Sequence, residues 1–183
     1  MTLDPKWIAS ELAAIDGLSA KPQEKGNRLE MLIKTIFSDV EGLQFEVSNV
    51  LNFYQTEEID LLFWNDRERR GLHFLDCPLI VECKNSKDAL SGRDLRYFAD
   101  TLRDKGRSSG VLVAISGVAG NKKFARAGFY HMTVALTQGV NILLVTREDL
   151  LSLTSGADLV MLLRRRLLSL VSSQVLDAVA AST

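Results

Sequence analysis

The amino-acid sequence predicts an α/β protein with a sheet of about five strands. Five short runs rich in Val, Ile, Leu and aromatic residues are bounded by polar or turn-forming residues, which is the pattern of half-buried or buried strands. Longer segments around them carry apolar residues at helical spacing. The chain has 183 residues, 46% of them hydrophobic and 25% charged, which suits one compact domain with a substantial core. We therefore expect a single domain over residues 1–183.

The helical segments differ in how clearly their ends are marked. Residues 17–25 contain Ser, Pro and Gly, so we expect a loop there. Ser91 is a suitable N-cap, because its hydroxyl can accept a hydrogen bond from the first turn of the helix that runs to Arg103. A short segment over residues 147–151 closes the domain. Long helices are expected over residues 5–15, 27–38, 92–103, 122–138 and 157–180.

Charged residues interrupt two of the apolar runs. Asp60 lies in the second run, and Glu82 and Lys84 lie in the third. A charge in such a run is costly to bury unless a partner compensates it. Side chains two residues apart on a strand point to one face, so Glu82 and Lys84 should project together. Asp60 joins them if the two strands are neighbours. The strands are expected over residues 45–53, 57–64, 78–85, 110–116 and 140–146.

These residue types suit a metal site with an adjacent cation. The carboxylates of Asp60 and Glu82 and the main-chain carbonyl of Cys83 are the hard oxygen donors that Mg²⁺ or Mn²⁺ prefers. Lys84 beside such a metal can orient or deprotonate a water, or stabilise charge on a phosphate. The alternative is a structural Glu–Lys pair on one strand face. That alternative explains neither the apolar flanks nor the third charge at Asp60.

The segment Glu57-Glu58-Ile59-Asp60, followed by Ile80-Val81-Glu82-Cys83-Lys84, resembles the motif of the PD-(D/E)xK nuclease superfamily. The order of the elements expected over residues 26–151 is also similar to that of Mrr-like type IV restriction endonucleases. The proline of the motif is missing before Asp60. The resemblance implies the restriction-endonuclease-like fold, a central mixed β-sheet of about five strands flanked by helices. To this core the chain adds an N-terminal helix and a C-terminal helix over about residues 157–180.

The resemblance also implies an activity. It implies a Mg²⁺- or Mn²⁺-dependent endonuclease that hydrolyses phosphodiester bonds in DNA, in restriction, defence or DNA repair, with RNA left open. Asp60, Glu82 and Lys84 would be catalytic. Glu30, on the helix before the Asp60 strand, would be a further catalytic acid, while its alternative role is an ion pair with Lys34. Because some superfamily members have lost activity, a non-catalytic nucleic-acid-binding or protein-interaction module is the alternative function.

Positive charge is unevenly distributed along the chain around the motif. The net charge of −1 offers no general attraction to nucleic acid, and residues 38–66 contain seven acids and no Lys or Arg. After residue 84 the balance reverses. A solvated helix face, with acids interleaved among the bases, is the alternative interpretation. The residues expected to contact phosphates are Lys87, Arg93, Arg96, Lys122, Lys123 and Arg126.

The C-terminal helical segment, residues 157–180, carries more apolar residues than one side of a solvated helix needs. Either a homodimer or the helix's own domain would cover that surface, and the sequence leaves both open. No N-terminal apolar signal segment is visible, and no run approaches the roughly 20 apolar residues of a membrane span. We therefore expect no membrane partner. Cys77 and Cys83 are the two cysteines, and so few favour a reducing cytoplasmic compartment.

Overall fold

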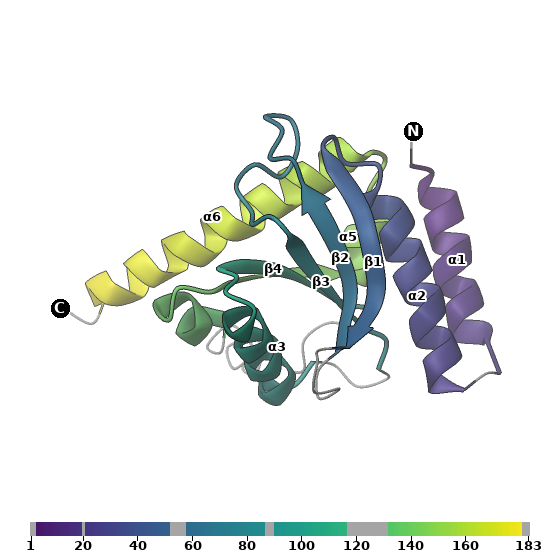
Figure 1. Ribbon diagram of the computed structural model, residues 1–183, viewed down its shortest axis with the longest axis horizontal. Coiled ribbons are helices and arrows are strands. Elements are labelled where there is room, and N and C mark those ends of the chain that lie inside the picture. The colour runs from purple at the N-terminus through teal and green to yellow at the C-terminus, as the bar shows by residue number, and fades with distance from the viewer. Residues whose placement is uncertain (1–2, 20, 52–57, 87–89, 117–131, 181–183) are drawn as a thin grey trace.

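The sheet is mixed and has five strands, as predicted. The structure is a computed structural model that describes residues 3–19, 21–51, 58–86, 90–116 and 132–180; of residues 50, 51 and 173–180 only the backbone is described. Neighbouring strands follow the chain order, β1-β2-β3-β4-β5 (Figure 1). β1, β2 and β3 pair antiparallel, whereas β3, β4 and β5 pair parallel. The strands are β1 (Leu43–Leu51), β2 (Glu58–Asn65), β3 (Leu79–Lys84), β4 (Ser109–Ala114) and β5 (Asn141–Thr146).

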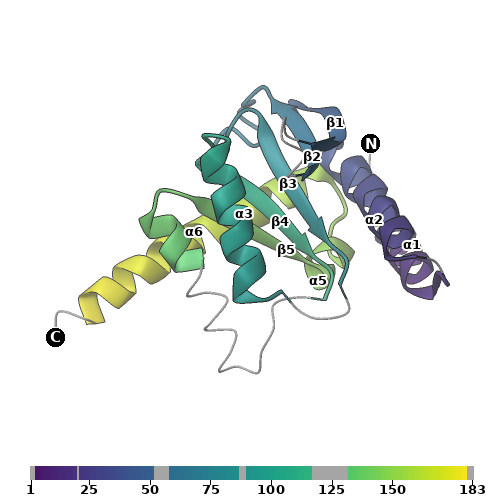
Figure 2. The same ribbon diagram turned by 60° about the horizontal axis from the view of Figure 1, so that its bottom comes forward.

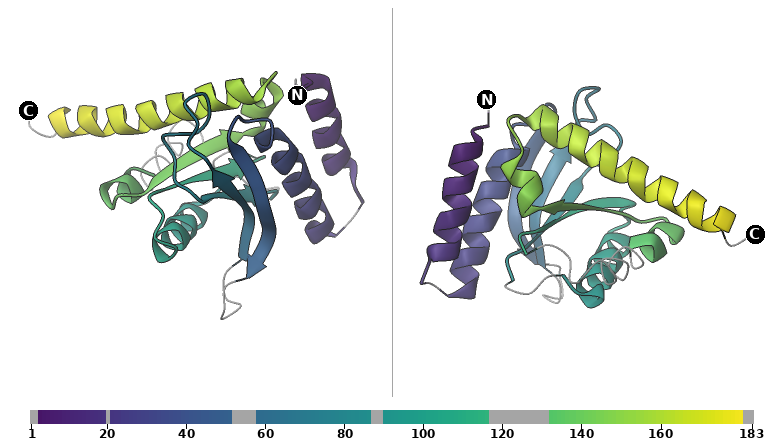
Figure 3. Two further views of the ribbon diagram at one scale, coloured as in Figure 1. Left: turned by 45° about the horizontal axis from the view of Figure 1, so that its top comes forward. Right: turned by 180° about the vertical axis from the view of Figure 1, so that it is seen from behind.

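Helices cover both faces of the sheet. In Figures 2 and 3, α2 and α6 lie on one face, with α1 outside α2, and α3 lies on the other. The expected helix near residues 122–138 falls largely outside the described residues, but its part over residues 132–137 is helical. The other helices are α1 (Pro5–Gly17), α2 (Pro22–Phe37), α3 (Gly92–Asp104), α5 (Arg147–Leu151) and α6 (Gly156–Ala180).

Two helix starts test the sequence analysis in opposite ways. Ser91 caps α3 as predicted, since its hydroxyl accepts a hydrogen bond from the Asp94 N–H while the Asp94 carboxylate accepts one from the Ser91 N–H. The loop predicted over residues 17–25 is wrong in its second half, because α2 already begins at Pro22. Proline is well suited to the first turn of a helix, where its missing N–H costs nothing.

The parallel strands are buried on both faces, which explains their continuous apolar runs. All six residues of β4 are buried, as are the first four of β3. The larger core lies between the sheet and α1, α2 and α6, with Phe37 stacked on Phe63 at a centroid distance of 5.6 Å. The smaller core lies under α3, where Phe98 and Leu102 contact strand residues such as Leu112.

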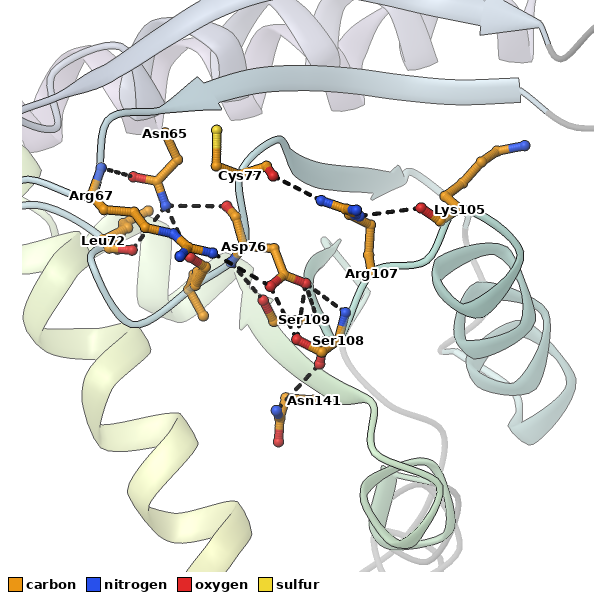
Figure 4. Close-up of polar contacts among 11 residues, drawn as sticks. Asn65, Arg67, Leu72, Asp76, Cys77, Lys105, Arg107, Ser108, Ser109 and Asn141 are labelled. Carbon is orange, nitrogen blue, oxygen red and sulfur yellow. Dashed lines mark hydrogen bonds and ion pairs between the residues drawn. The ribbon is translucent and has the colours of Figure 1, made fainter.

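A network of hydrogen bonds holds the amino ends of β3 and β4 together (Figure 4). The Asp76 carboxylate accepts hydrogen bonds from the backbone N–H groups of Ser108 and Ser109 at 2.5 and 2.9 Å. The Asn65 side-chain amide donates to the carbonyl oxygens of Leu72, Leu75 and Asp76. The polar connection between β2 and β3 is therefore tied to the start of β4.

The C-terminal helix α6 is only partly covered by its own domain. Leu159, Leu163 and Leu170 are buried, whereas Leu168 and Val171 are 64% and 46% exposed. Its C-terminal end extends past the edge of the sheet in Figures 1 and 3. No helix in the described part of the chain is long and apolar enough to cross a membrane.

Candidate functional site

The charged end of β3 lies at the carboxyl edge of the parallel strands. Glu82 is 5% exposed, and the Lys84 ammonium nitrogen lies 2.6 Å from its Oε1. This ion pair confirms that the two side chains share a strand face. The intervening Cys83 packs against the larger core on the other face, next to Val81. Glu82 therefore sits in a dry environment with one cation beside it.

Asp60 lies at the same place on the neighbouring strand. The β2–β3 register pairs Leu61 with Val81, so one further step brings Asp60 opposite Glu82. The Asp60 Oδ2 accepts a hydrogen bond from the Cys83 N–H at 2.7 Å. This bond fixes the carboxylate at the end of β3. The structure thus brings Asp60, Glu82 and Lys84 together, as the sequence predicted.

Glu30 adds a third acid from α2. It is 8% exposed, and its Oε2 accepts a hydrogen bond from the Asn49 side-chain amide at 3.1 Å. The predicted alternative, an ion pair with Lys34, is not formed, because the Lys34 ammonium lies 3.7 Å from the centroid of the Phe45 ring. Sequence reasoning missed Asn49. The only sequence signal for Asn49 is an asparagine within an expected strand, which is weak. In the structure its backbone is left-handed, with φ +54°, a conformation that asparagine adopts more readily than most residues.

Burial and neighbouring carboxylates disfavour the ionisation of all three acids. Burial, and then repulsion by Asp60, raise the pKa of Glu82 to about 7 in spite of the neighbouring Lys84. Burial also raises the pKa of Asp60, although the Cys83 N–H opposes that shift. Burial and repulsion by Asp60 raise the pKa of Glu30. The site therefore has an excess of buried negative charge that a proton or a cation would relieve.

The two other titratable groups of β3 hold their protons. Burial alone would lower the pKa of Lys84, but attraction to Glu82 and Asp60 outweighs it and leaves that pKa raised. Lys84 is thus a cation that donates hydrogen bonds rather than a base. Burial and the nearby carboxylates raise the pKa of the Cys83 thiol well above its usual value. Cys83 could therefore serve a metal through its carbonyl oxygen, as predicted, and not through a thiolate.

The donor set fits a hard cation that keeps much of its water. Within the described ranges, no three His, Cys, Asp or Glu side chains are grouped to hold a metal. Two carboxylates, Asp60 and Glu82, and the Cys83 carbonyl are the available donors. Lys84 contacts one oxygen of Glu82, and the Cys83 N–H donates to one oxygen of Asp60. No described residue donates to the second oxygen of either carboxylate. Mg²⁺ is bound in this way, through one or two carboxylates plus waters.

The predicted phosphate contacts are only partly placed. Arg93 and Arg96 are exposed on the first turns of α3. Asp94, between them, helps to raise the pKa of Lys84, so this end of α3 lies near the charged end of β3. Sequence reasoning did not connect Asp94 with Lys84. The other four predicted contacts, Lys87, Lys122, Lys123 and Arg126, lie outside the described residues.

Comparison with known proteins gives no match, either to a protein-family model or to a curated protein. The resemblance to the PD-(D/E)xK superfamily therefore rests on the motif and the order of elements.

The raised pKa of Glu82 predicts how stability depends on pH in the presence of a chelator. The folded state holds a proton on Glu82 up to about pH 7, whereas the unfolded chain releases it near pH 4.5. The free energy of unfolding should therefore fall as pH rises between these values. Glu82→Gln should abolish most of this slope and be about 1–3 kcal/mol more stable than wild type at pH 8. Urea denaturation from pH 4.5 to 8 measures both effects.

The control for this prediction is Glu148→Gln, an exposed substitution on α5 that should keep the wild-type profile. A wild-type profile that is flat between pH 4.5 and 7 would contradict the prediction.

Proposed function

We propose that this protein is a metal-dependent endonuclease that hydrolyses phosphodiester bonds in DNA. One observation carries the proposal: the partly buried carboxylate of Asp60 and the buried carboxylate of Glu82 meet at the end of β3 beside the Lys84 ammonium. Buried acids with raised pKa values next to a single cation are characteristic of functional sites. An ordinary structural ion pair does not need the second and third carboxylates. This arrangement supports a site built to hold a divalent cation.

Each residue has a distinct role in the proposal. Asp60, Glu82 and the Cys83 carbonyl would hold Mg²⁺ or Mn²⁺, which activates water and offsets the charge of the phosphate when bound. The Lys84 ammonium, held by Glu82, would donate a hydrogen bond to the attacking water or to a phosphate oxygen. Glu30 would be a further catalytic acid, and the hydrogen bond that its carboxylate accepts from Asn49 holds it in place. The exposed Arg93 and Arg96 would contact phosphates along the strand.

Removal of the Lys84 ammonium tests the proposal directly. Lys84→Ala should lower the single-turnover cleavage rate about 100- to 1,000-fold, because a donor aimed at developing charge is lost. The affinity for DNA, measured in Ca²⁺, should fall by no more than the contribution of one phosphate contact. Cleavage of labelled duplex, branched and single-stranded DNA, and of RNA, in Mg²⁺, Mn²⁺ or chelator gives the rates. Lys6→Ala, on the exposed side of α1, is the matched control.

Two results would count against the nuclease. If Lys84→Ala cleaves at the wild-type rate, this motif is not the catalytic site. If wild type binds DNA in Ca²⁺ but cleaves no substrate in Mg²⁺ or Mn²⁺, the non-catalytic binding module is the better description.

Metal binding is tested separately through Asp60. Asp60→Asn keeps an oxygen for the Cys83 N–H but removes one of few negative charges from the site. We expect Mn²⁺ affinity to fall at least tenfold, with the fold retained. Isothermal titration calorimetry measures the affinity, and Asp66→Asn, just beyond the other end of β2, is the control. Unchanged Mn²⁺ affinity in Asp60→Asn would remove Asp60 from the site.

We further propose that α6 pairs with a second copy of the chain, because it carries exposed apolar residues, Met161, Leu168 and Val171, beside those buried in its own domain. Light scattering at micromolar concentration should give a dimer for wild type and a monomer for Leu168→Glu with Val171→Glu. These positions are exposed, so the substitutions spare the domain core, unlike substitutions at the buried Leu163 and Leu170. Ser169→Glu, exposed between them, should stay dimeric. A monomeric wild type would refute the pairing.

A further inference from the structure

A groove opens at the carboxyl ends of the parallel strands, one residue beyond Lys84. Its volume is about 900 Å³, within the range of pockets that bind small molecules. Figure 2 shows the ends of these strands gathered beside α5 and α2. The groove is lined by the end of α1, the start of α2 and the residues that follow β3, β4 and β5; they are Ile15, Asp16, Leu18, Ser19, Pro22, Lys25, Asn85, Ser86, Ile115, Ser116 and Arg147.

The wall of this groove is continuous with the candidate active site. The Lys84 carbonyl accepts a hydrogen bond from the Ile115 N–H at 3.2 Å. The Asn85 side-chain amide donates to the Lys25 carbonyl at 3.2 Å. The Ser116 hydroxyl donates to the Ser86 carbonyl. The groove opens on the side of the sheet that α1 and α2 cover, whereas Glu82 and Lys84 project to the side of α3. A strand of nucleic acid that crosses the carboxyl edge of the sheet from Lys84 would reach the groove with its next nucleotide.

The chemistry of the lining suits a nucleotide. Leu18, which is partly exposed, provides apolar surface for the face of a base, next to the buried Ile15 and Ile115. Lys25 and Arg147 provide two cations against one carboxylate, that of Asp16. Asp16 holds both cations in place, because its carboxylate lies 2.7 Å from the Arg147 guanidinium and its carbonyl accepts from the Lys25 ammonium at 3.1 Å. The remaining positive charge suits a phosphate.

Hydroxyl and amide groups complete the lining. Ser19, Ser86, Ser116 and Asn85 carry groups that can hydrogen-bond the polar edge of a base. Among the residues that the structure describes, no aromatic side chain lines the groove, so the apolar contact that they offer to a base is aliphatic. An unpaired, unstacked base can use both its face and its hydrogen-bonding edge with these apolar and polar groups, whereas a base within a duplex cannot.

We propose that the groove binds an unpaired nucleotide adjacent to the scissile phosphate. Bases of an intact duplex are stacked and paired, and they reach such a groove only after costly extrusion. A single strand, a flap or a gap presents them without that cost. The inference rests on the proposed nuclease function and narrows its substrate: strands with an unpaired nucleotide next to the cleaved bond are preferred over intact duplex.

Filling the groove tests this inference. Ser116 is exposed and lines the groove, so the ring of Ser116→Tyr would occupy the space for the base. We expect Ser116→Tyr to weaken binding of a labelled 20-nucleotide single strand in Ca²⁺ at least tenfold. Its affinity for the matching 20-base-pair duplex should stay within about twofold of wild type. Fluorescence anisotropy measures both, and Ser10→Tyr, exposed on α1 outside the groove, is the control.

A second variant removes charge without adding bulk. Lys25→Gln should weaken single-strand binding several-fold and reduce the slope of its salt dependence by about 0.7, the value for one phosphate contact on a single strand. Lys21→Gln, exposed just before α2 and outside the groove, should leave both unchanged. If Ser116→Tyr does not fold, Lys25→Gln still decides the outcome.

The outcomes separate this inference from the proposed function. Lys84-dependent cleavage together with unchanged single-strand binding in Ser116→Tyr and Lys25→Gln overturns the groove and leaves the nuclease. Groove-dependent binding without cleavage in Mg²⁺ or Mn²⁺ overturns the nuclease and supports the groove. A wild type that binds and cleaves intact duplex better than single strands, flaps or gaps overturns the preference for unpaired nucleotides.

Discussion

The direction of β3 relative to its neighbours is the constraint on which the rest of the molecule depends. β3 pairs antiparallel with β2 and parallel with β4. Antiparallel pairing places the start of β2, with Asp60, against the end of β3, with Glu82 and Lys84. Parallel pairing places the ends of β3, β4 and β5 at that same edge. One topological feature thus produces both the charged site and the adjacent groove, in agreement with the rule that ligands of open α/β sheets bind beyond the carboxyl ends of strands.

The acids at this edge carry negative charge that the neighbouring residues compensate only in part. Glu82, Asp60 and Glu30 all have raised pKa values, with burial as the first cause. Repulsion by Asp60 adds to the shifts of Glu82 and Glu30, and repulsion by Glu58 adds to that of Asp60. Lys84, whose own pKa is raised chiefly by Glu82 and Asp60, compensates only part of the negative charge. A fold selected for stability alone would replace such a cluster with apolar residues. The cost of keeping two buried acids, Glu30 and Glu82, and the partly buried Asp60 around one ammonium is therefore a physical argument for function.

The sequence predicted local structure well and long-range structure only where a motif linked two strands. The five strands and the Ser91 cap were predictable because apolar runs and capping residues are local signals. The early start of α2 was missed, because Ser, Pro and Gly also favour loops. The role of Asn49 and the groove beyond Lys84 were not predictable, since each depends on segments that only the sheet brings together. The spacing in α6 predicted an apolar excess, but it did not distinguish the buried Leu163 from the exposed Leu168.

The two edges of the parallel strands contrast in how their polar groups are satisfied. At the amino edge, Asp76 accepts hydrogen bonds from the N–H groups of Ser108 and Ser109, and the Arg107 guanidinium donates to the Cys77 carbonyl (Figure 4). These partners lie within the protein, so this edge stabilises the fold without a ligand. At the carboxyl edge, the acids around Lys84 outnumber their cation, and the groove beside them presents hydroxyl, amide and cationic groups to solvent. Because buried charge without full compensation is unfavourable, the carboxyl edge is the one that would be stabilised by the cation and the phosphate of the proposed function.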